Sequence, residues 1–428
     1  MRDRRFIALF SIVFVDLIGF GIMIPILLLH AERSFGATDL QATGLLTAYS
    51  VGLVVAGPIL GRLSDAFGRR PVLIISQIGT LIGFIILALA NSLWMLYLGR
   101  IIDGVSGGNI TTAHAYINDI TTEKNRARGF GLIAAAFSSG FIVGPALSGL
   151  VVNFTSNVPS LTQYTQSAPF LLAAMFSLAS ILGTYFFLPE SLAKEDRNPL
   201  RGGRKGGKKS DGLFDVLQVR NVRVILTFTF ITFLGFSLLQ ASFALFISRN
   251  IFPDEPLELV QRNIGFLLTW LGVISVLMQT FFVGRLVKRF GEQRLVVFAT
   301  FLRGLAFLGV ALSRDAYLLA IVFIPFAVGN SISQPSVQSM ISRFAPPEMR
   351  GSVMGVFQST NSTTLIVGPI IAGLLLQTQF ASISAQTQAA MPMFVGAILM
   401  GIAFIMSLRL LRMDLPTQEA EISVAEHV

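Results

Sequence analysis

The sequence predicts an all-α membrane protein in which twelve transmembrane helices form two related halves of six. Hydrophobic residues make up 53% of the 428 residues and charged residues only 13%, about half the charged fraction of a soluble protein. The mean hydropathy is +0.71. Twelve apolar runs each reach the length of about 20 residues that a helix needs to cross a bilayer. In addition, short motifs of the first half recur in the second half.

The twelve apolar runs define the expected spans. In chain order they are 6–29, 43–62, 71–90, 93–117, 129–152, 168–188, 223–247, 263–286, 294–312, 315–338, 351–376 and 392–411. The first run is too long for the apolar core of a signal peptide, and it has no small-residue cleavage site. We therefore expect it to remain in the protein as the first span.

A long polar segment follows the sixth run and divides the chain into six spans plus six. It contains two Gly-Gly pairs, and seven Lys or Arg residues lie between Lys194 and Lys209. We expect a flexible linker, with contact to anionic lipid headgroups as the alternative role. The predicted domains are a six-helix half at 1–188, a cytoplasmic basic linker at 189–221, a six-helix half at 222–412 and a cytoplasmic tail at 413–428.

The distribution of basic residues predicts the orientation. With the N-terminus placed in the cytoplasm, 26 of the 32 Lys and Arg residues lie on the cytoplasmic side. Only four lie in the opposite loops, and these are Arg33, Arg249, Arg262 and Arg314. Because positive charge accumulates on the cytoplasmic side, we expect both termini inside and a multi-pass protein of the cell (inner or plasma) membrane.

Internal repeats relate the two halves. The Gly-Arg-Leu and Phe-Gly elements of residues 61–68 recur at identical spacing in residues 284–291. The Gly-Pro motif of residues 144–149 recurs in residues 368–373. Two parallel six-span repeats are typical of carriers that expose one midplane site alternately to the two sides.

Two motifs resemble those of the major facilitator superfamily. The loop after the second run contains Gly61, Asp65, Gly68, Arg69 and Arg70 at the spacing of that superfamily's loop signature. In the fourth run, the segment from Arg100 through Asp103 to Gly104 resembles its Arg-x-x-x-Gly element.

Further motifs resemble those of drug:proton antiporters. In the fifth run, the antiporter signature of that group is matched by Gly131, Gly140, Gly144, Pro145 and Gly149. Asp16 with Gly21 and Pro25, and the segment Pro189-Glu190-Ser191, resemble the TetA-type (tetracycline efflux) branch. The resemblance covers nearly the whole chain outside the linker and the tail. It implies the major facilitator fold and export in exchange for protons.

Three positions depart from the resembled pattern. Ser148 stands where the antiporter signature usually has glycine, and Gly83 and Arg303 stand where TetA-type exporters usually carry acids in spans 3 and 9. The last two departures count against tetracycline itself as the substrate, although not against an export mechanism.

Asp16 and Asp103 are the only acids deep within the spans, and each is expected near the bilayer midplane. Intramembrane acids are candidates for function because a charge there costs at least about 2.5–3.5 kcal/mol. Arg100 lies three residues before Asp103 on the same helical face, so a fixed ion pair is the alternative reading of Asp103. For Asp16 the alternatives are a protonated acid or a helix-packing hydrogen bond. We favour Asp16 as the main proton site, with Asp103 and Arg100 as its switchable partner or as part of the substrate site.

Two other polar residues in the spans have open roles. Arg303 is expected to pair with a polar neighbour or to extend towards an interface, or else to pair with substrate or with an acid of another span. His114 is expected to pack as a polar group or to join a proton relay.

Uncharged polar and aromatic residues in spans 7, 8, 10 and 11 are candidates for a substrate cavity. With Arg303 added, the candidate set is Phe236, Gln240, Phe243, Trp270, Gln279, Asn330, Gln334, Gln358 and Asn361. Some of the amides are expected only to bridge helices. A cavity of this composition suits a lipophilic or cationic compound better than a sugar.

The glycine-rich motifs are expected to serve conformational change. Gly140, Gly144 and Gly149 permit close helix approach, and Pro145 allows a bend. The resemblance implies that the loop at 61–70 latches the cytoplasmic side, with Asp119 as its ionic partner. Lys288 replaces Asp65 in the second repeat, so we expect the latch to rest on the first half.

These observations favour a proton-coupled antiporter that exports lipophilic, drug-like molecules. An importer or facilitator of a metabolite, or a lipid transporter, is the alternative, and a non-transporting receptor is less favoured. We expect no enzymatic activity, and no ATP-binding GxxxxGK[ST] loop is present. We expect no cofactor and no metal, since the chain has no Cys and only three His. The expected partners are a small-molecule substrate, protons and membrane lipids, without nucleic acid, and we expect a monomer.

Overall fold

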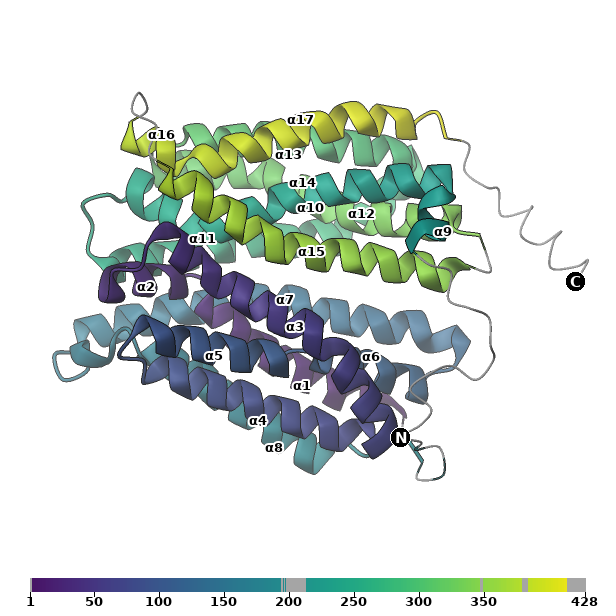
Figure 1. Ribbon diagram of the computed structural model, residues 1–428, viewed down its shortest axis with the longest axis horizontal. Coiled ribbons are helices and arrows are strands. Elements are labelled where there is room, and N and C mark those ends of the chain that lie inside the picture. The colour runs from purple at the N-terminus through teal and green to yellow at the C-terminus, as the bar shows by residue number, and fades with distance from the viewer. Residues whose placement is uncertain are drawn as a thin grey trace, which may run out of the picture. The chain divides into compact units, whose positions relative to one another are not determined.

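The structure is a computed structural model that describes residues 2–193, 195, 197, 213–346, 349–378 and 384–413, without the side chains of residues 2–7, 109, 123–132, 134, 137 and 138. Within these residues every regular element is a helix (Figure 1). Eleven helical segments of the described part are long and apolar enough to cross a membrane. Most of the expected basic linker and the tail from residue 414 lie outside the described residues.

Two of the first six spans are interrupted near their middle. The helices of this half are α1 (Arg2–Met23), α2 (Leu27–Phe35), α3 (Asp39–Phe67), α4 (Arg69–Ala88), α5 (Leu93–Ser106), α6 (Asn109–Ile120), α7 (Glu123–Asn157), the short η1 (Thr162–Tyr164) and α8 (Ala168–Phe187). Span 1 breaks between α1 and α2 around Pro25, which has no backbone N–H to donate. Span 4 breaks at Gly107 and Gly108, and neither α5 nor α6 alone is long enough to cross. Counted together as one span, α5 and α6 bring the eleven long helical segments of the described part to the predicted twelve. The predicted all-α architecture is thereby confirmed.

The second six spans contain two π-helical turns. Their elements are α9 (Leu213–Gln218), α10 (Arg220–Phe246), η3 (Ile247–Ile251), α11 (Leu257–Leu277), η4 (Met278–Phe282), α12 (Val283–Phe290), α13 (Glu292–Leu312), α14 (Ala316–Phe344), α15 (Arg350–Gln377), α16 (Ala385–Ala389) and α17 (Met391–Leu410). The π-turns are η3, at the end of span 7, and η4, inside span 8. Such turns are rare and are frequent at functional sites.

The helices form two compact units whose limits differ from those of the sequence repeats. Unit 1 comprises residues 1–207, 241–273 and 369–389, and unit 2 comprises residues 208–240, 274–368 and 390–428. In unit 1, α1 packs against α7 and α8, and α4 packs between α5 and α8 (Figure 1). In unit 2, α13 packs between α14 and α17, and apolar side chains such as Phe228, Met340 and Val353 form a buried cluster.

Candidate functional site

A buried ion pair lies inside unit 1. Arg100 and Asp103 are one turn apart on α5, and Nη1 of Arg100 lies 2.7 Å from Oδ2 of Asp103. Their residues are only 1% and 3% exposed. The ring of Tyr49, on α3, lies 4.1 Å from the guanidinium carbon of Arg100. The cation is therefore held by a carboxylate on one side and by an aromatic face on the other.

Helix α4 approaches Asp103 unusually closely because position 83 has no side chain. A Cβ atom at Gly83 would lie 3.0 Å both from Cβ of Asp103 and from the carbonyl oxygen of Gly99. The Thr80 hydroxyl on the same helix donates a hydrogen bond to the Asp103 carboxylate. Thus the glycine that stands where the resembled exporters carry an acid is the residue that makes room for Asp103.

Tyr49 adds an aromatic side chain to the buried pair. Its ring faces the guanidinium group of Arg100, which also pairs with Asp103. Phe20, one turn after Asp16 on α1, contacts the Tyr49 ring at a centroid distance of 5.4 Å. The structure therefore clusters Tyr49, Arg100 and Asp103, and Asp16 lies one turn from the Phe20–Tyr49 contact in the same unit. Sequence reasoning missed Tyr49, because a tyrosine in an apolar span has no distinctive pattern.

The glycines of the antiporter motif bring α7 against α1. A Cβ atom at Gly144 would lie 2.6 Å from the backbone of Gly21, and one at Gly140 would lie 2.7 Å from Cβ of Leu17. Only glycine at these positions permits the two backbones to approach so closely. Asp16 directly precedes Leu17, so this crossing fixes its depth and direction on α1.

The opposite face of the same motif packs on α11. A Cβ atom at Gly265 would lie 2.5 Å from the carbonyl oxygen of Pro145, and one at Gly149 would lie 3.0 Å from that of Arg262. Gly131 lies in the part of α7 whose side chains are not described. The motif therefore joins spans 1, 5 and 8 within unit 1.

The loop between α3 and α4 is built around Arg69. Gly68 adopts a φ of +106°, which only glycine takes readily, and it allows α4 to begin immediately after α3 ends. Arg69 lies 2.5 Å from Asp65 and 3.0 Å from Asp119. Gly61, the first residue of the same motif, is not tightly packed. Among the described residues, a Cβ atom placed there would meet no other part of the chain within 4 Å. The two acids expected to act in the latch thus share one guanidinium group.

Glu190 and Ser191 complete this cluster, a role that the sequence did not reveal. The Glu190 carboxylate accepts the backbone N–H groups of Arg69 (2.9 Å) and Arg70 (3.2 Å) at the start of α4. Ser191 donates to Asp119 at 2.9 Å. A carboxylate at a helix N-terminus satisfies otherwise unpaired N–H groups and opposes the helix dipole favourably.

Arg303 lies in the interior of unit 2 with neutral partners. It is 3% exposed on α13, and it donates to the carbonyl oxygen of Thr232 at 3.2 Å and to the hydroxyl of Ser333 at 3.5 Å. Within the described part of the chain, no ion pair of Arg303 with a carboxylate is present. A pairing with substrate stays a prediction.

The other candidates for the substrate cavity are divided between the two units. Phe243 and Trp270 belong to unit 1, and the remaining seven belong to unit 2. In unit 2, the Phe236 ring stacks on that of Phe326 at 6.3 Å. His114 lies half-buried on α6. A common cavity and a relay through His114 stay predictions.

The profile of the Major Facilitator Superfamily matches residues 9–260 and again residues 226–427. The chain belongs to the major facilitator superfamily. The double match agrees with the internal repeat, and it identifies the protein as a multi-pass membrane transporter.

Relatives within the superfamily share nearly the whole length of this chain. The tetracycline resistance protein, class C, of Escherichia coli is 30% identical over 93% of this chain and 94% of its own length. The multidrug resistance protein 2 of Bacillus subtilis (strain 168) is 27% identical over 86% of this chain and 88% of its own. The crystal structure of the nucleoside transporter NupG has the same fold, with a TM-score of 0.70 at 14% identity over 95% of this chain and 98% of its own.

Proposed function

We propose that this major facilitator is a proton-coupled antiporter that exports lipophilic, drug-like molecules by alternating access. The observation that carries the proposal is the buried ion pair of Arg100 and Asp103 beside Tyr49, in the same unit as Asp16. Acids at membrane depth are the groups by which transporters carry protons. Relatives named for tetracycline and multidrug resistance support a drug as the substrate.

Asp16 is the main proton site in this proposal. Asp103 is held by Arg100 at 2.7 Å, so its carboxylate is already engaged in an ion pair. A proton from the outer side neutralises Asp16 and favours one state of the transporter, and the substrate competes with that proton. Asp103 with Arg100, which contacts Tyr49, is the switchable partner of Asp16 in this proposal.

The candidates for the substrate site in this proposal are polar and aromatic residues of spans 7 to 11. They are Phe236, Gln240, Phe243, Trp270, Gln279, Arg303, Asn330, Gln334, Gln358 and Asn361. Apolar and aromatic walls with a few amides suit a lipophilic compound. The cluster around Arg69 latches the cytoplasmic side, and both termini face the cytoplasm of a cell (inner or plasma) membrane.

The test measures transport driven by a pH gradient in inverted membrane vesicles. Tetracycline, ethidium and tetraphenylphosphonium are the probes. We expect Asp16→Asn to abolish gradient-driven uptake while binding of the transported probe stays detectable by thermal shift. Full uptake by this variant would contradict the proposal.

Proton release distinguishes the antiporter from a facilitator or an importer. Addition of the bound probe to purified protein in weak buffer should release protons from an antiporter, because substrate and proton compete. Asp16→Asn should release fewer protons. Probe binding by the unmodified protein without any proton release would favour a facilitator.

A further inference from the structure

The π-turn η4 and helix α12 carry an exposed aromatic and basic surface at one end of span 8. The side chains of Phe281 and Phe282 are 52% and 50% exposed. Arg285, Lys288 and Arg289 follow within the next two turns and are also exposed. These three cations are called the basic face of α12 below. The surface therefore changes from aromatic to cationic along a single helix.

The opposite side of α12 is fixed in the interior of unit 2. Val283 is buried, and Leu286 and Val287 pack against a buried cluster that contains Leu295 and Ala299 of α13. Residues three or four positions apart lie on one side of a helix, so the apolar residues and the basic face lie on opposite sides. This packing directs the basic face away from the core of unit 2.

No carboxylate neutralises the basic face within the part of the chain that the structure describes. Arg285 donates to the carbonyl oxygen of Phe281, in η4, at 2.7 Å. The nearest acid in the sequence is Glu292, and it already accepts a hydrogen bond from Ser339 at 2.6 Å and lies 3.7 Å from Arg343. The basic face therefore keeps its full positive charge.

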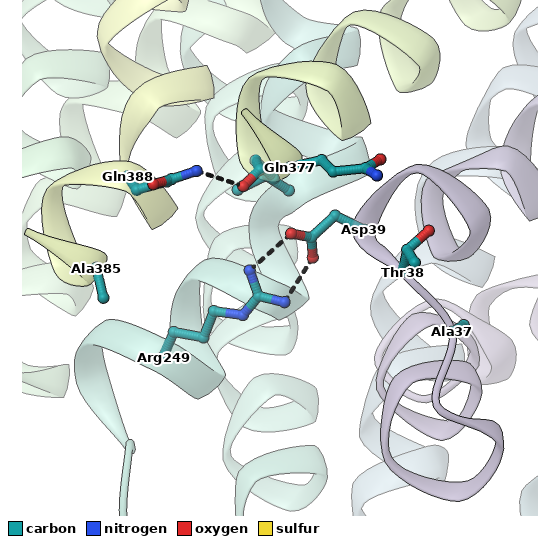
Figure 2. A pocket seen from close by; sticks show the side chains of 8 residues that line it. Ala37, Thr38, Asp39, Arg249, Gln377, Ala385 and Gln388 are labelled. Atoms are coloured by element: carbon teal, nitrogen blue, oxygen red, sulfur yellow. Dashed lines mark hydrogen bonds and ion pairs between the residues drawn. The ribbon is translucent and has the colours of Figure 1, made fainter. Parts of the chain in front are cut away.

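Other basic residues at the ends of spans are neutralised by acids. Arg249, at the end of span 7, lies 2.8 Å from Glu32 and also pairs with Asp39. Figure 2 shows the two contacts between Arg249 and Asp39. Arg69 likewise shares two carboxylates. Since the basic face has no such partner, it attracts anionic groups from its surroundings.

The internal repeat shows how the second half differs from the first at this place. Lys288 occupies the position of Asp65. A Cβ atom at Gly68 would lie 2.5 Å from the Glu190 carboxylate, which covers that glycine. Gly291 has the equivalent position and a φ of +77°, but a Cβ atom there would meet no other part of the described chain within 4 Å. Lys288 lies one turn before Gly291, so a bulky anionic group has room beside its ammonium group.

The surface lies where span 8 is expected to leave the apolar part of the membrane. The apolar run ends at residue 286, so the two phenylalanines are expected at the depth of lipid chains and the basic face at the depth of lipid headgroups. Only 11% of the residues in the most apolar stretch of span 8 are buried within the protein. The aromatic rings are therefore available to lipid chains.

We propose that the basic face of α12, together with Phe281 and Phe282, binds an anionic phospholipid. The guanidinium and ammonium groups donate hydrogen bonds to the phosphate oxygens, and the two rings contact the acyl chains. The lipid belongs to the leaflet at this end of span 8, which is the cytoplasmic leaflet in the orientation proposed above. The binding itself requires neither protons nor a transported substrate.

A tryptophan placed at this surface reports which lipid contacts it. Phe282→Trp keeps an aromatic side chain, and the fluorescence of the two native tryptophans is subtracted with the unmodified chain. The full-length protein is reconstituted into mixed vesicles of phosphatidylcholine and phosphatidylglycerol. The acyl chains of one lipid or the other are brominated, and bromine quenches tryptophan fluorescence on contact. Comparison of the two quenching curves gives the preference for the anionic lipid.

Ile59→Trp is the matched control. Ile59 has the same place in the first repeat and is 52% exposed, but the loop beside it carries Asp65 where the second repeat has Lys288. At Phe282→Trp we expect phosphatidylglycerol to bind about fivefold or more tightly than phosphatidylcholine, because each cation at a membrane surface contributes roughly that factor. At Ile59→Trp the two lipids should bind similarly. Equal binding at both positions would overturn the proposal.

Charge variants in the Phe282→Trp chain test the basic face directly. Arg285→Gln, Lys288→Gln and Arg289→Gln together should remove the preference, and high salt should reduce it when the three cations are present. If the triple variant folds poorly, Lys288→Asp alone installs the acid of the first repeat and should lower the preference by about fivefold or more. A preference that persists in the variant that folds would overturn the site.

The acidic tail of the chain is the other candidate occupant, and a further variant distinguishes it from lipid. Glu419→Gln, Glu421→Gln and Glu426→Gln together should leave the preference for phosphatidylglycerol unchanged. A severalfold rise would assign the basic face to the tail and overturn lipid as its occupant. None of these measurements uses a pH gradient or a substrate. A negative result would therefore count against the lipid site and not against proton-coupled export.

Discussion

Asp103 and Arg100 are buried together, and each offsets the cost of burying the other. A charge removed from water without a partner costs several kcal/mol, whereas a paired charge with additional contacts costs much less. Here the additional contacts come from Tyr49 and Thr80. The pair is therefore both a stability feature of unit 1 and a part of the proposed coupling site.

Removing one member of this pair should cost more stability than removing both. Asp103→Asn leaves Arg100 as an uncompensated buried cation, with an expected loss of about 3–5 kcal/mol in the free energy of unfolding. Arg100→Leu combined with Asp103→Leu should recover much of that loss, while transport stays absent. Thermal unfolding of the single and double variants in detergent measures both effects. Equal destabilisation by all of them would contradict the mutual compensation.

Gly83 should tolerate no larger side chain. Gly83→Ala introduces a methyl group 3.0 Å from Asp103 and from the Gly99 carbonyl, so α4 must move away from α5. Overpacking of this kind costs about 1–3 kcal/mol. The matched control is Gly401→Ala on α17, where a Cβ atom meets no neighbour within 4 Å. The unfolding temperature should fall for the first variant and not for the second.

Residues differ in how well the sequence predicts their place. Asp16, Asp103 and Arg100 stand out because a charge inside an apolar run is costly and conspicuous. Glu32 and Asp39 do not stand out, because acids at span ends are ordinary and their partner Arg249 is distant in the chain. The available signal was the small number of basic residues expected on the outer side, of which Arg33, Arg249 and Arg262 all bond to other segments.

Helix α7 has demanding packing, because its glycines approach the backbones of both α1 and α11 closely. Gly144→Ala would place a methyl group 2.6 Å from the backbone of Gly21, a position that no side-chain rotation relieves. We expect the free energy of unfolding to fall by about 3 kcal/mol or more, and the yield of folded protein to be low. Gly355→Ala on α15 meets no neighbour within 4 Å and should be neutral or stabilising by about 0.5–1 kcal/mol. The yield of monodisperse protein after purification is compared between the two variants. Equal yields would contradict the close crossing of α7 and α1.

Helix α4 depends on a cap supplied from outside its own sequence. Glu190→Gln removes the negative charge at its N-terminus and weakens two hydrogen bonds, with an expected loss of about 0.5–2 kcal/mol. Glu195→Gln, a few residues further along and exposed, is the control and should change little. The difference in unfolding temperature between these variants tests the cap. If both variants unfold at the same temperature, Glu190 does not stabilise α4.

The existence of the helices follows from hydropathy, and their irregularities do not. Apolar runs identify the spans because the membrane requires about 20 such residues in each. The π-turns η3 and η4 depend on which hydrogen bond closes each turn, and hydropathy contains no information about that choice. The break in span 4 at Gly107 and Gly108 lies inside one apolar run, so the run alone predicts a continuous helix.

At the scale of the molecule, the first half of the sequence does not make a complete unit. Residues 241–273 and 369–389 of the second half pack within unit 1 and cover α7 and α3. We therefore expect residues 1–207 expressed alone to aggregate. Co-expression with residues 208–428 as a separate chain should restore a monodisperse complex. Size-exclusion chromatography checks this, and a monodisperse first half alone would contradict it.

The twelve spans and the repeat could be read from the sequence, whereas the division into compact units could not. Span identity depends on local composition, and the repeat on motifs at matching spacing. The units depend on close approaches such as those of Gly265 to Pro145 and Gly373 to Leu40, between residues far apart in the chain. No local pattern specifies which helix ends will meet.

Three helices belong to both units, and this has a mechanical consequence. Helices α10, α11 and α15 pass without interruption from one unit to the other, at residues 240–241, 273–274 and 368–369. The alternating access proposed above therefore requires bending within these three helices. In α15 the crossing falls at Gly368-Pro369, where the proline leaves one backbone carbonyl without its helical partner. Under that proposal, we expect substitutions that stiffen these three points to slow transport without changing the affinity for the substrate.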